Sequence, residues 1–170
     1  MPRAVIIAGP NGAGKTTFAR ALFELEFEGR EQLAYHLNAD ELARARNLGL
    51  IAAGRAMLES LERAVVERSD FVIETTLASR GYARRIPEWQ AAGYDVSLHF
   101  LTLSSDDAAV ARVARRVAAG GHNVPEADIR RRYHRGLDLF ERTYKVMVDR
   151  WNVWQSREGG FENVQSSNQS

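Results

Sequence analysis

The chain's 170 residues suffice for one domain of ordinary size, and 45% hydrophobic with 26% charged residues is typical of a globular protein. A net charge of +1 argues against a general polyanion-binding protein, and the absence of cysteine excludes disulfide frameworks and thiolate metal sites. The first residues do not resemble a secretory signal, and no segment approaches the roughly 20 apolar residues of a membrane span. We therefore expect a cytoplasmic protein.

Apolar runs typical of buried strands alternate along the chain with amphipathic or capped helical segments. Strands are expected at 5–8, 33–38, 71–74 and from Tyr94, with a last short one in WNVWQ (151–155). Helices are expected at 15–27, 51–66, 82–92 and 106–119, and in a long segment with the apolar stripe Leu137, Phe140, Tyr144, Met147 and Trp151. This alternation predicts an α/β fold, in which helices cover both faces of a parallel sheet.

A glycine-rich turn follows the first strand. It reads Gly9, Pro10, Asn11, Gly12, Ala13, Gly14, Lys15, Thr16 and Thr17, and it matches G-x-x-x-x-G-K-[ST] at every specified position. Such a loop directs backbone N–H groups at phosphate oxygens, while the lysine contacts the outer phosphates and the hydroxyl binds Mg²⁺. We expect ATP and Mg²⁺ here; a plain strand-to-helix link is the alternative that the complete motif disfavours.

The motif narrows the fold to an α/β P-loop NTPase, a nucleoside-kinase-like three-layer sandwich with a mainly parallel five-stranded sheet. The sequence has neither the LSGGQ-type segment of transport ATPases nor the N-K-x-D guanine reader of GTPases. What remains is the compact kinase plan, in which loops at the carboxyl ends of the strands bind a second substrate beside the ATP phosphates. Residues 1–158 are assigned to this domain and 159–170 to a polar, mobile tail.

Two acidic residues come directly after predicted strands. Asp40 is placed to accept the proton of an attacking hydroxyl, and its alternative role is an N-cap for the next helix. Glu74 ends a buried strand, as expected of a metal or substrate ligand. Thr75, Thr76 and Arg80 follow it as candidates for binding the acceptor, although Arg80 also fits a solvated helix start.

An arginine-rich segment, residues 108–136, forms two predicted helices around a glycine hinge. Between positions 112 and 135 it holds seven arginines against two acids. This is typical of a lid that closes over a triphosphate and excludes water, and a solvated basic face is the alternative. Arg116 and one of Arg131 or Arg132 are the preferred functional members. The four histidines show no metal-ligand spacing and are interpreted as structural: His36, His99, His122 and His134.

In this order, the motifs GPNGAGKTT, NADELAR, VIETTLASR and RVARRVAAGGHNVPEADIRRRY resemble the zeta-toxin family of P-loop kinases, from Ala4 to about Trp154. Characterised members phosphorylate the 3′-hydroxyl of UDP-N-acetylglucosamine and are neutralised by a small antitoxin. The resemblance implies Lys15 and Thr16 for ATP and Mg²⁺, Asp40 as general base, Glu74 as a substrate-side acid and Arg116 as a lid arginine. The second lid arginine of larger members falls near Gly121 or His122, so Arg131 or Arg132 would replace it.

Three interpretations of function follow. The first is an ATP-dependent kinase of a small hydroxyl-bearing acceptor, which the resemblance implies to be UDP-N-acetylglucosamine, with an antitoxin as a candidate protein partner. The second is a kinase of another metabolite or of a nucleic-acid end, with strongly salt-dependent binding; the balanced charge disfavours nucleic acid. The third is a non-catalytic module whose ATP state a protein partner reads, in which loss of Asp40 leaves ATP binding unchanged. No membrane partner is expected.

Overall fold

The computed structural model describes residues 1–26 and 35–167. Its elements in chain order are β1 (Arg3–Ala8), α1 (Lys15–Glu26), β2 (Tyr35–Leu37), α2 (Ala39–Arg46), α3 (Leu50–Val66), β3 (Phe71–Thr75), α4 (Gly81–Ala91), β4 (Asp95–Thr102), α5 (Asp106–Ala118), α6 (Glu126–Arg142), the 3₁₀ turn η1 (Tyr144–Val146), β5 (Arg150–Arg157) and β6 (Gly160–Ser166). Three parts of the predictions lie outside the described residues: the end of the first helix at position 27, the first two residues of the strand predicted at 33–38, and the last three residues of the predicted tail.

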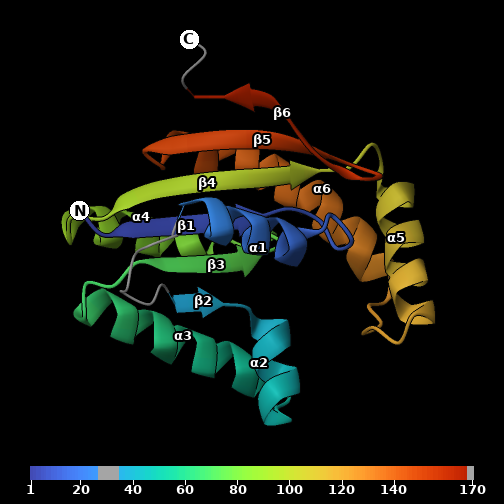
Figure 1. Cartoon of the computed structure of the whole chain (residues 1–170), viewed down its shortest axis with the longest axis horizontal. Helices are drawn as coiled ribbons and strands as arrows, with labels where there is room; N and C mark the ends of the chain where they lie inside the picture. The colour runs from blue at the N-terminus through green and yellow to red at the C-terminus, as the bar shows by residue number, and fades with distance from the viewer. Residues whose placement is uncertain (27–34, 168–170) are drawn as a thin grey trace.

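The strands form one sheet in the order β2-β3-β1-β4-β5-β6 (Figure 1). The pairs from β2 to β5 are parallel, and β6 alone is antiparallel to its neighbour. The sheet is therefore mainly parallel, as predicted, and the α/β fold class is confirmed. Among the described residues the sheet has six strands, whereas the sequence predicts five.

The sixth strand occupies residues that the sequence assigns to a polar tail. β6 pairs along β5 from Ser166 opposite Asn152 to Gly160 opposite Arg157. Gly159, with φ at +96°, makes the tight turn between them. Because β6 is mostly exposed and polar, it lacks the apolar pattern that reveals a strand. Its anchor is Phe161, whose ring lies 5.1 Å from the ring of Phe18 in α1.

Helices cover both faces of the sheet. Alternate residues of β1 enter two separate clusters: Ile6 packs with α3, α4 and α6, and Ile7 packs with α1 and α5. Figure 1 shows α1 in front of the sheet and α4 and α6 behind it. Burial on both faces explains why the central strands read as continuous apolar runs. None of the helices in the described ranges is both long and apolar enough to cross a membrane.

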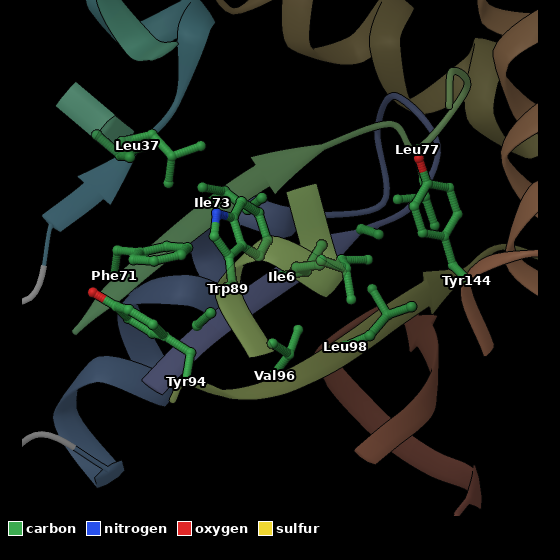
Figure 2. Close-up of a cluster of buried hydrophobic side chains, with 14 of the residues drawn as sticks. Ile6, Leu37, Phe71, Ile73, Leu77, Trp89, Tyr94, Val96, Leu98 and Tyr144 are labelled. Carbon is green, nitrogen blue, oxygen red and sulfur yellow. The ribbon is translucent and has the colours of Figure 1, made fainter. Parts of the chain in front are cut away.

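The larger cluster is shown in Figure 2. At one end Phe71 lies between Trp89 and Tyr94, with ring centroids 5.0 and 5.2 Å away. At the other end lie Leu77 and Tyr144, whose hydroxyl donates to Ser79 O at 2.6 Å. Tyr144 and Leu77 therefore fix the loop between β3 and α4, which borders the cleft described below.

The last predicted helix is shorter than its apolar stripe. α6 ends at Arg142, Tyr144 lies in η1, and Trp151 lies in β5 opposite Leu98 of β4. Leu137, which the stripe places on the buried side, is 38% exposed. The prediction of one continuous stripe is therefore wrong. The segment around Trp151 pairs with β4 as strand β5, and this pairing outweighs the helical spacing of its apolar residues.

Two helix-interior glycines are expected to respond oppositely to replacement by alanine. A Cβ at Gly136 would lie 2.5 Å from the backbone oxygen of Thr76, whereas a Cβ at Gly54 would meet nothing within 4 Å. Gly136→Ala should therefore destabilise the protein by about 2 kcal/mol through overpacking. Gly54→Ala should stabilise it by about 0.5–1 kcal/mol through helix propensity. Urea unfolding of both variants measures the difference, and equal shifts would contradict the close packing of α6 on this loop.

Stability should fall on acidification because of His99. The ring is buried, and its Nδ1 accepts a hydrogen bond from Trp154 Nε1 at 3.1 Å. Burial, assisted by Arg150, lowers the pKa of His99 to about 4. Between that value and about 6.5 the unfolded chain binds the extra proton, so stability is lost as pH falls through this window. From pH 7 to pH 5 we expect this histidine to cost about 2 kcal/mol, and the neutral variant His99→Gln to lose correspondingly less in urea unfolding.

Candidate active site

A cleft of about 740 Å³ opens where β1 and β3 end. The glycine-rich loop, the start of α2, the loop after β3 and the arginines of α5 and α6 line it. The predicted site residues on its wall are Asn11, Gly12, Gly14, Lys15, Thr16, Thr17, Asp40, Glu74, Thr75, Thr76, Arg116, Arg131 and Arg132. Other wall residues that the sequence analysis did not select are Asn38, Ala39, Met57, Ala78, Ser79, Tyr82, Arg112 and Arg115.

Four predicted site residues do not line the cleft. Gly9, Pro10 and Ala13 are buried behind it, where they shape the loop. Arg80 is exposed at the N-cap position of α4, which matches its alternative interpretation as a solvated helix start.

The glycine-rich loop has the backbone of a phosphate cradle. Gly12 and Gly14 have φ of +82° and +85°, a region that L side chains rarely adopt. A Cβ at Gly9 would lie 2.3 Å from Leu101 O, so this turn fits against β4 only with glycine. Within the described chain, the buried Asn11 Oδ1 has no hydrogen-bond partner. A loop with glycines in this conformation points its backbone N–H groups toward one concavity, which fits the phosphates of a nucleotide.

Lys15 extends across this loop. Its Nζ donates to Gly9 O at 2.9 Å and to Pro10 O at 3.0 Å. Burial lowers the pKa of Lys15 to about 8, although the carboxylates of Glu74 and Asp40 oppose the shift. The ammonium thus lies between the loop and both predicted acids, where a bound phosphate would add further compensation.

Glu74 is held by two donors. Thr16 Oγ1 donates to Glu74 Oε2 at 2.8 Å, and His36 Nε2 lies 2.7 Å from Glu74 Oε1. Burial alone would raise the pKa of Glu74, but the hydrogen bonds from His36 and Thr16 outweigh it and lower that pKa. The same bond raises the pKa of His36. The sequence predicts a structural role for His36 because the histidines show no metal-ligand spacing; its contact with Glu74 comes from the pairing of β2 with β3.

The oxygen atoms at this point fit Mg²⁺. Thr16 Oγ1 and Glu74 Oε2 are hard oxygen donors at the mouth of the phosphate cradle. The described residues contain no group of three or more histidines or acids that could hold a metal by themselves. A magnesium ion here would therefore complete its octahedron with phosphate oxygens and water, as this ion commonly does.

Asp40 also lies on the cleft wall, in the first turn of α2. Asn38 Oδ1 accepts from the backbone N–H groups of Asp40 at 2.9 Å and Glu41 at 3.4 Å. Asn38 is therefore the N-cap, and the alternative reading of Asp40 as the cap is wrong. The Asp40 carboxylate instead lies near enough to Lys15 to raise its pKa.

The arginines on the cleft wall differ in their partners. Arg116 donates to His122 O at 2.9 Å, and Arg131 pairs with Asp128 at 2.8 Å. Arg112 donates to Ser156 Oγ at 2.6 Å. No hydrogen bond or ion pair joins Arg132 to another residue of the described part, and its charge reaches Lys15 strongly enough to lower the lysine pKa.

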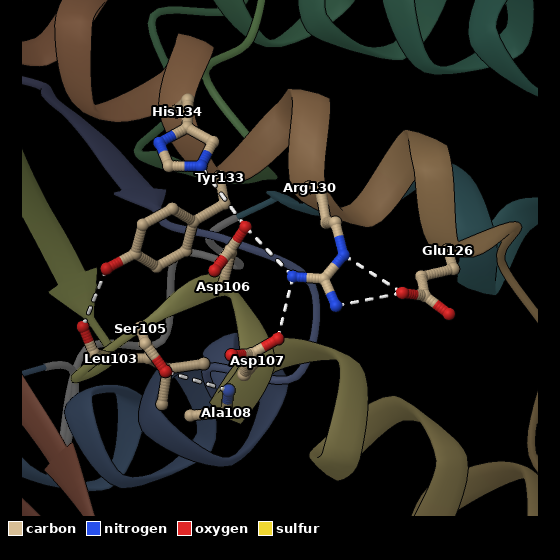
Figure 3. Close-up of polar contacts among 9 residues, drawn as sticks. All are labelled: Leu103, Ser105, Asp106, Asp107, Ala108, Glu126, Arg130, Tyr133 and His134. Atoms are coloured by element: carbon tan, nitrogen blue, oxygen red, sulfur yellow. Dashed lines mark hydrogen bonds and ion pairs between the residues drawn. The ribbon is translucent and has the colours of Figure 1, made fainter.

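Arg130 belongs to a separate ionic cluster (Figure 3). Its guanidinium lies 3.0 Å from Asp106, 2.8 Å from Asp107 and 2.8 Å from Glu126. Arg130 lowers the pKa of Asp106, with a smaller contribution from His134. The cluster ties the start of α5 to the first turns of α6, so this arginine stabilises the segment and does not serve the cleft.

The strand order, the glycine-rich loop and the cleft together define a P-loop kinase-like nucleotide-binding fold. Residues 5–135 match the family described as AAA domain, and the chain belongs to that family. A protein of Haemophilus influenzae described as uncharacterized is 26% identical over 136 residues, which are 77% of this chain and 92% of that protein.

Solved structures with the same fold include toxin and kinase proteins. A chain of the PezAT chromosomal toxin-antitoxin system of Streptococcus pneumoniae has a TM-score of 0.72 at 21% identity, covering 100% of this chain and 74% of its own. The structure of AvrRxo1-ORF1:-ORF2 with ATP has a TM-score of 0.68 at 14% identity, covering 98% of this chain and 58% of that chain. A gluconokinase from Sinorhizobium meliloti has a TM-score of 0.56 at 15% identity, covering 91% of this chain and 83% of that chain. At these identities the likeness establishes the fold alone.

Proposed function

We propose that the protein is an ATP-dependent kinase that transfers the γ-phosphate to a hydroxyl group of a small-molecule acceptor. The observation that carries the proposal is one cleft that holds the phosphate loop, Lys15, the pair Thr16–Glu74 and Asp40. The loop and Lys15 account for nucleotide binding, and a carboxylate in the same cleft is what a transfer reaction needs in addition. The likeness to a gluconokinase supports the class of reaction.

The residues then divide the work of transfer. Backbone N–H groups of the loop and the Lys15 ammonium bind the β- and γ-phosphates. Thr16 and Glu74 would hold Mg²⁺, which neutralises charge on the phosphate oxygens when bound. Asp40 accepts the proton of the acceptor hydroxyl as its oxygen bonds to the γ-phosphorus and the bond to the β-phosphate oxygen breaks, releasing ADP. Arg116 and Arg132 stabilise the charge that develops on the transferred group.

The proposed acceptor is UDP-N-acetylglucosamine, modified at the 3′-hydroxyl in the cytoplasm. The motif resemblance to zeta toxins supports it, and so does the likeness to a chain of a toxin-antitoxin system. The same likeness supports a small antitoxin as a protein partner. Another metabolite with a free hydroxyl is the second acceptor to test, because the cleft wall also offers Ser79 and Tyr82.

Acceptor-dependent release of ADP tests the proposal. The purified protein is mixed with Mg-ATP, and ADP is followed by a coupled assay with and without UDP-N-acetylglucosamine or a metabolite extract. A kinase releases ADP faster when its acceptor is present. ATP binding without acceptor-dependent ADP release from any pool would instead favour a non-catalytic, ATP-dependent interaction module.

Two neighbouring arginines of α6 should contribute unequally to transfer. Arg132 lies on the cleft wall without an ionic partner among the described residues, whereas Asp128 already neutralises Arg131. Arg132→Gln is expected to lower kcat about 100-fold, as loss of a transition-state donor does. Arg131→Gln should change kcat no more than about threefold, since exposed ion pairs contribute little. Steady-state kinetics compares the two variants, and a larger loss at Arg131 would contradict these assignments.

A further inference from the structure

We propose that His36 is a positioning residue of the metal–nucleotide site: it fixes the Glu74 carboxylate so that the Thr16 hydroxyl keeps a lone pair turned toward the metal. The inference rests on the nucleotide site of the proposed function and not on the transfer step. It concerns a histidine that does not itself line the cleft and reaches it through Glu74.

The Glu74 carboxylate is held at both oxygens. His36 Nε2 lies 2.7 Å from Oε1, and Thr16 Oγ1 lies 2.8 Å from Oε2. The Glu74 side chain is 3% exposed, so water does not compete for either oxygen. The terminal torsion of a glutamate is broad and twofold, so one donor alone leaves the carboxylate free to turn. Two donors from opposite sides fix its plane.

The direction of the Thr16 hydrogen bond decides how this hydroxyl can act. A hydroxyl has one proton and two lone pairs. When the proton points to Glu74 Oε2, one lone pair accepts from Asn38 Nδ2 at 3.5 Å and the other is left for a cation on the cleft side, where Thr16 lies on the wall. Partners of a metal ligand orient it in this way, and their loss commonly costs 10- to 100-fold in metal affinity.

His36 is itself fixed by the sheet. It lies in β2 opposite Val72 of β3, one residue before Leu37 pairs with Ile73. Its ring centroid is 5.6 Å from that of Phe23 in α1. The ring therefore connects β2 and β3 to α1, whose first turn holds Thr16, and the edge strand of the sheet supports the metal side of the site.

Nucleotide binding with and without Mg²⁺ tests the proposal. The dissociation constant of a fluorescent ATP analogue is measured in excess Mg²⁺ and in EDTA for the wild type and three variants. His36→Ala should lose about 10-fold or more of the tightening that Mg²⁺ produces, with little change in EDTA. His36→Gln should restore it to within about threefold, because its amide N–H can replace Nε2–H. His36→Asn is one methylene shorter and should behave as His36→Ala.

The control is His134→Ala, which removes an exposed histidine bound to Asp106 outside the cleft and should change neither constant. Equal weakening in Mg²⁺ and in EDTA would assign His36 a purely structural role and overturn the proposal. Equal behaviour of the Gln and Asn variants would also overturn it, and that comparison decides the matter even if His36→Ala does not fold. Because no acceptor is added, failure of the kinase proposal would leave this result readable.

Discussion

Replacing Asp40 with asparagine is expected to lower kcat by about 10²- to 10⁴-fold, the usual contribution of a general base, with ATP affinity within about twofold of wild type. The change keeps the size of the side chain and removes its negative charge and its basicity. Asp40 is not needed to cap α2, because Asn38 performs that role, so the helix should remain intact. Kinetics with the identified acceptor and equilibrium binding of ATP measure the two effects.

The matched control is Glu41→Gln. Glu41 is the next residue in the same first helical turn, and it does not line the cleft. Both variants lose one negative charge near the start of α2, so any helix-dipole effect is shared. Glu41→Gln should keep wild-type kcat. If Asp40→Asn retains more than about a tenth of the activity, Asp40 is not the general base.

Lys15→Met is expected to weaken ATP binding about 10- to 100-fold, since charge-assisted hydrogen bonds to phosphate contribute about 1.5–3 kcal/mol. A loss of kcat of about 10²-fold or more should accompany it, because the ammonium also faces the transferred group. Methionine keeps most of the length of the side chain, so the variant removes the ammonium together with its hydrogen bonds to Gly9 O and Pro10 O. Isothermal titration with ATP measures the first effect.

Lys145 is the only other lysine of the sequence and serves as the control. Its ammonium lies 4.3 Å from the centre of the Trp151 ring and pairs with Glu141, away from the cleft. Lys145→Met should leave ATP affinity unchanged. A Lys15→Met variant that binds ATP as tightly as wild type would contradict the phosphate site.

The sequence predicts the central fold well because its signals are local. A continuous apolar run and the glycine-rich turn specify β1, the loop and the start of α1, and the structure confirms the mainly parallel sheet. Ser105 accepts from Ala108 N at 3.1 Å at the start of α5, as the capping serines predict. The location of the cleft, between the strand ends and the arginine-rich helices, is also predictable, since the carboxyl ends of parallel strands lie at one side of the sheet.

The remaining features depend on contacts between distant segments. His36 and Glu74 are brought together by the pairing of β2 with β3, and the residues around His36 in the sequence do not predict this contact. β6 is polar and acquires its strand conformation from β5. The sequence does not distinguish Arg130 from Arg132. In the structure, acids of α5 and α6 neutralise Arg130, whereas Arg132 lines the cleft.

The most direct test of the kinase account follows the phosphate itself. ATP labelled with ¹⁸O in the γ-phosphate is incubated with the protein, Mg²⁺ and a metabolite pool containing UDP-N-acetylglucosamine, and products are analysed by mass spectrometry beside Asp40→Asn. The account predicts a phosphorylated acceptor that carries the label, formed by the wild type and essentially absent with the variant. Tight ATP binding with no labelled acceptor from any pool, or equal labelling by both proteins, would contradict it.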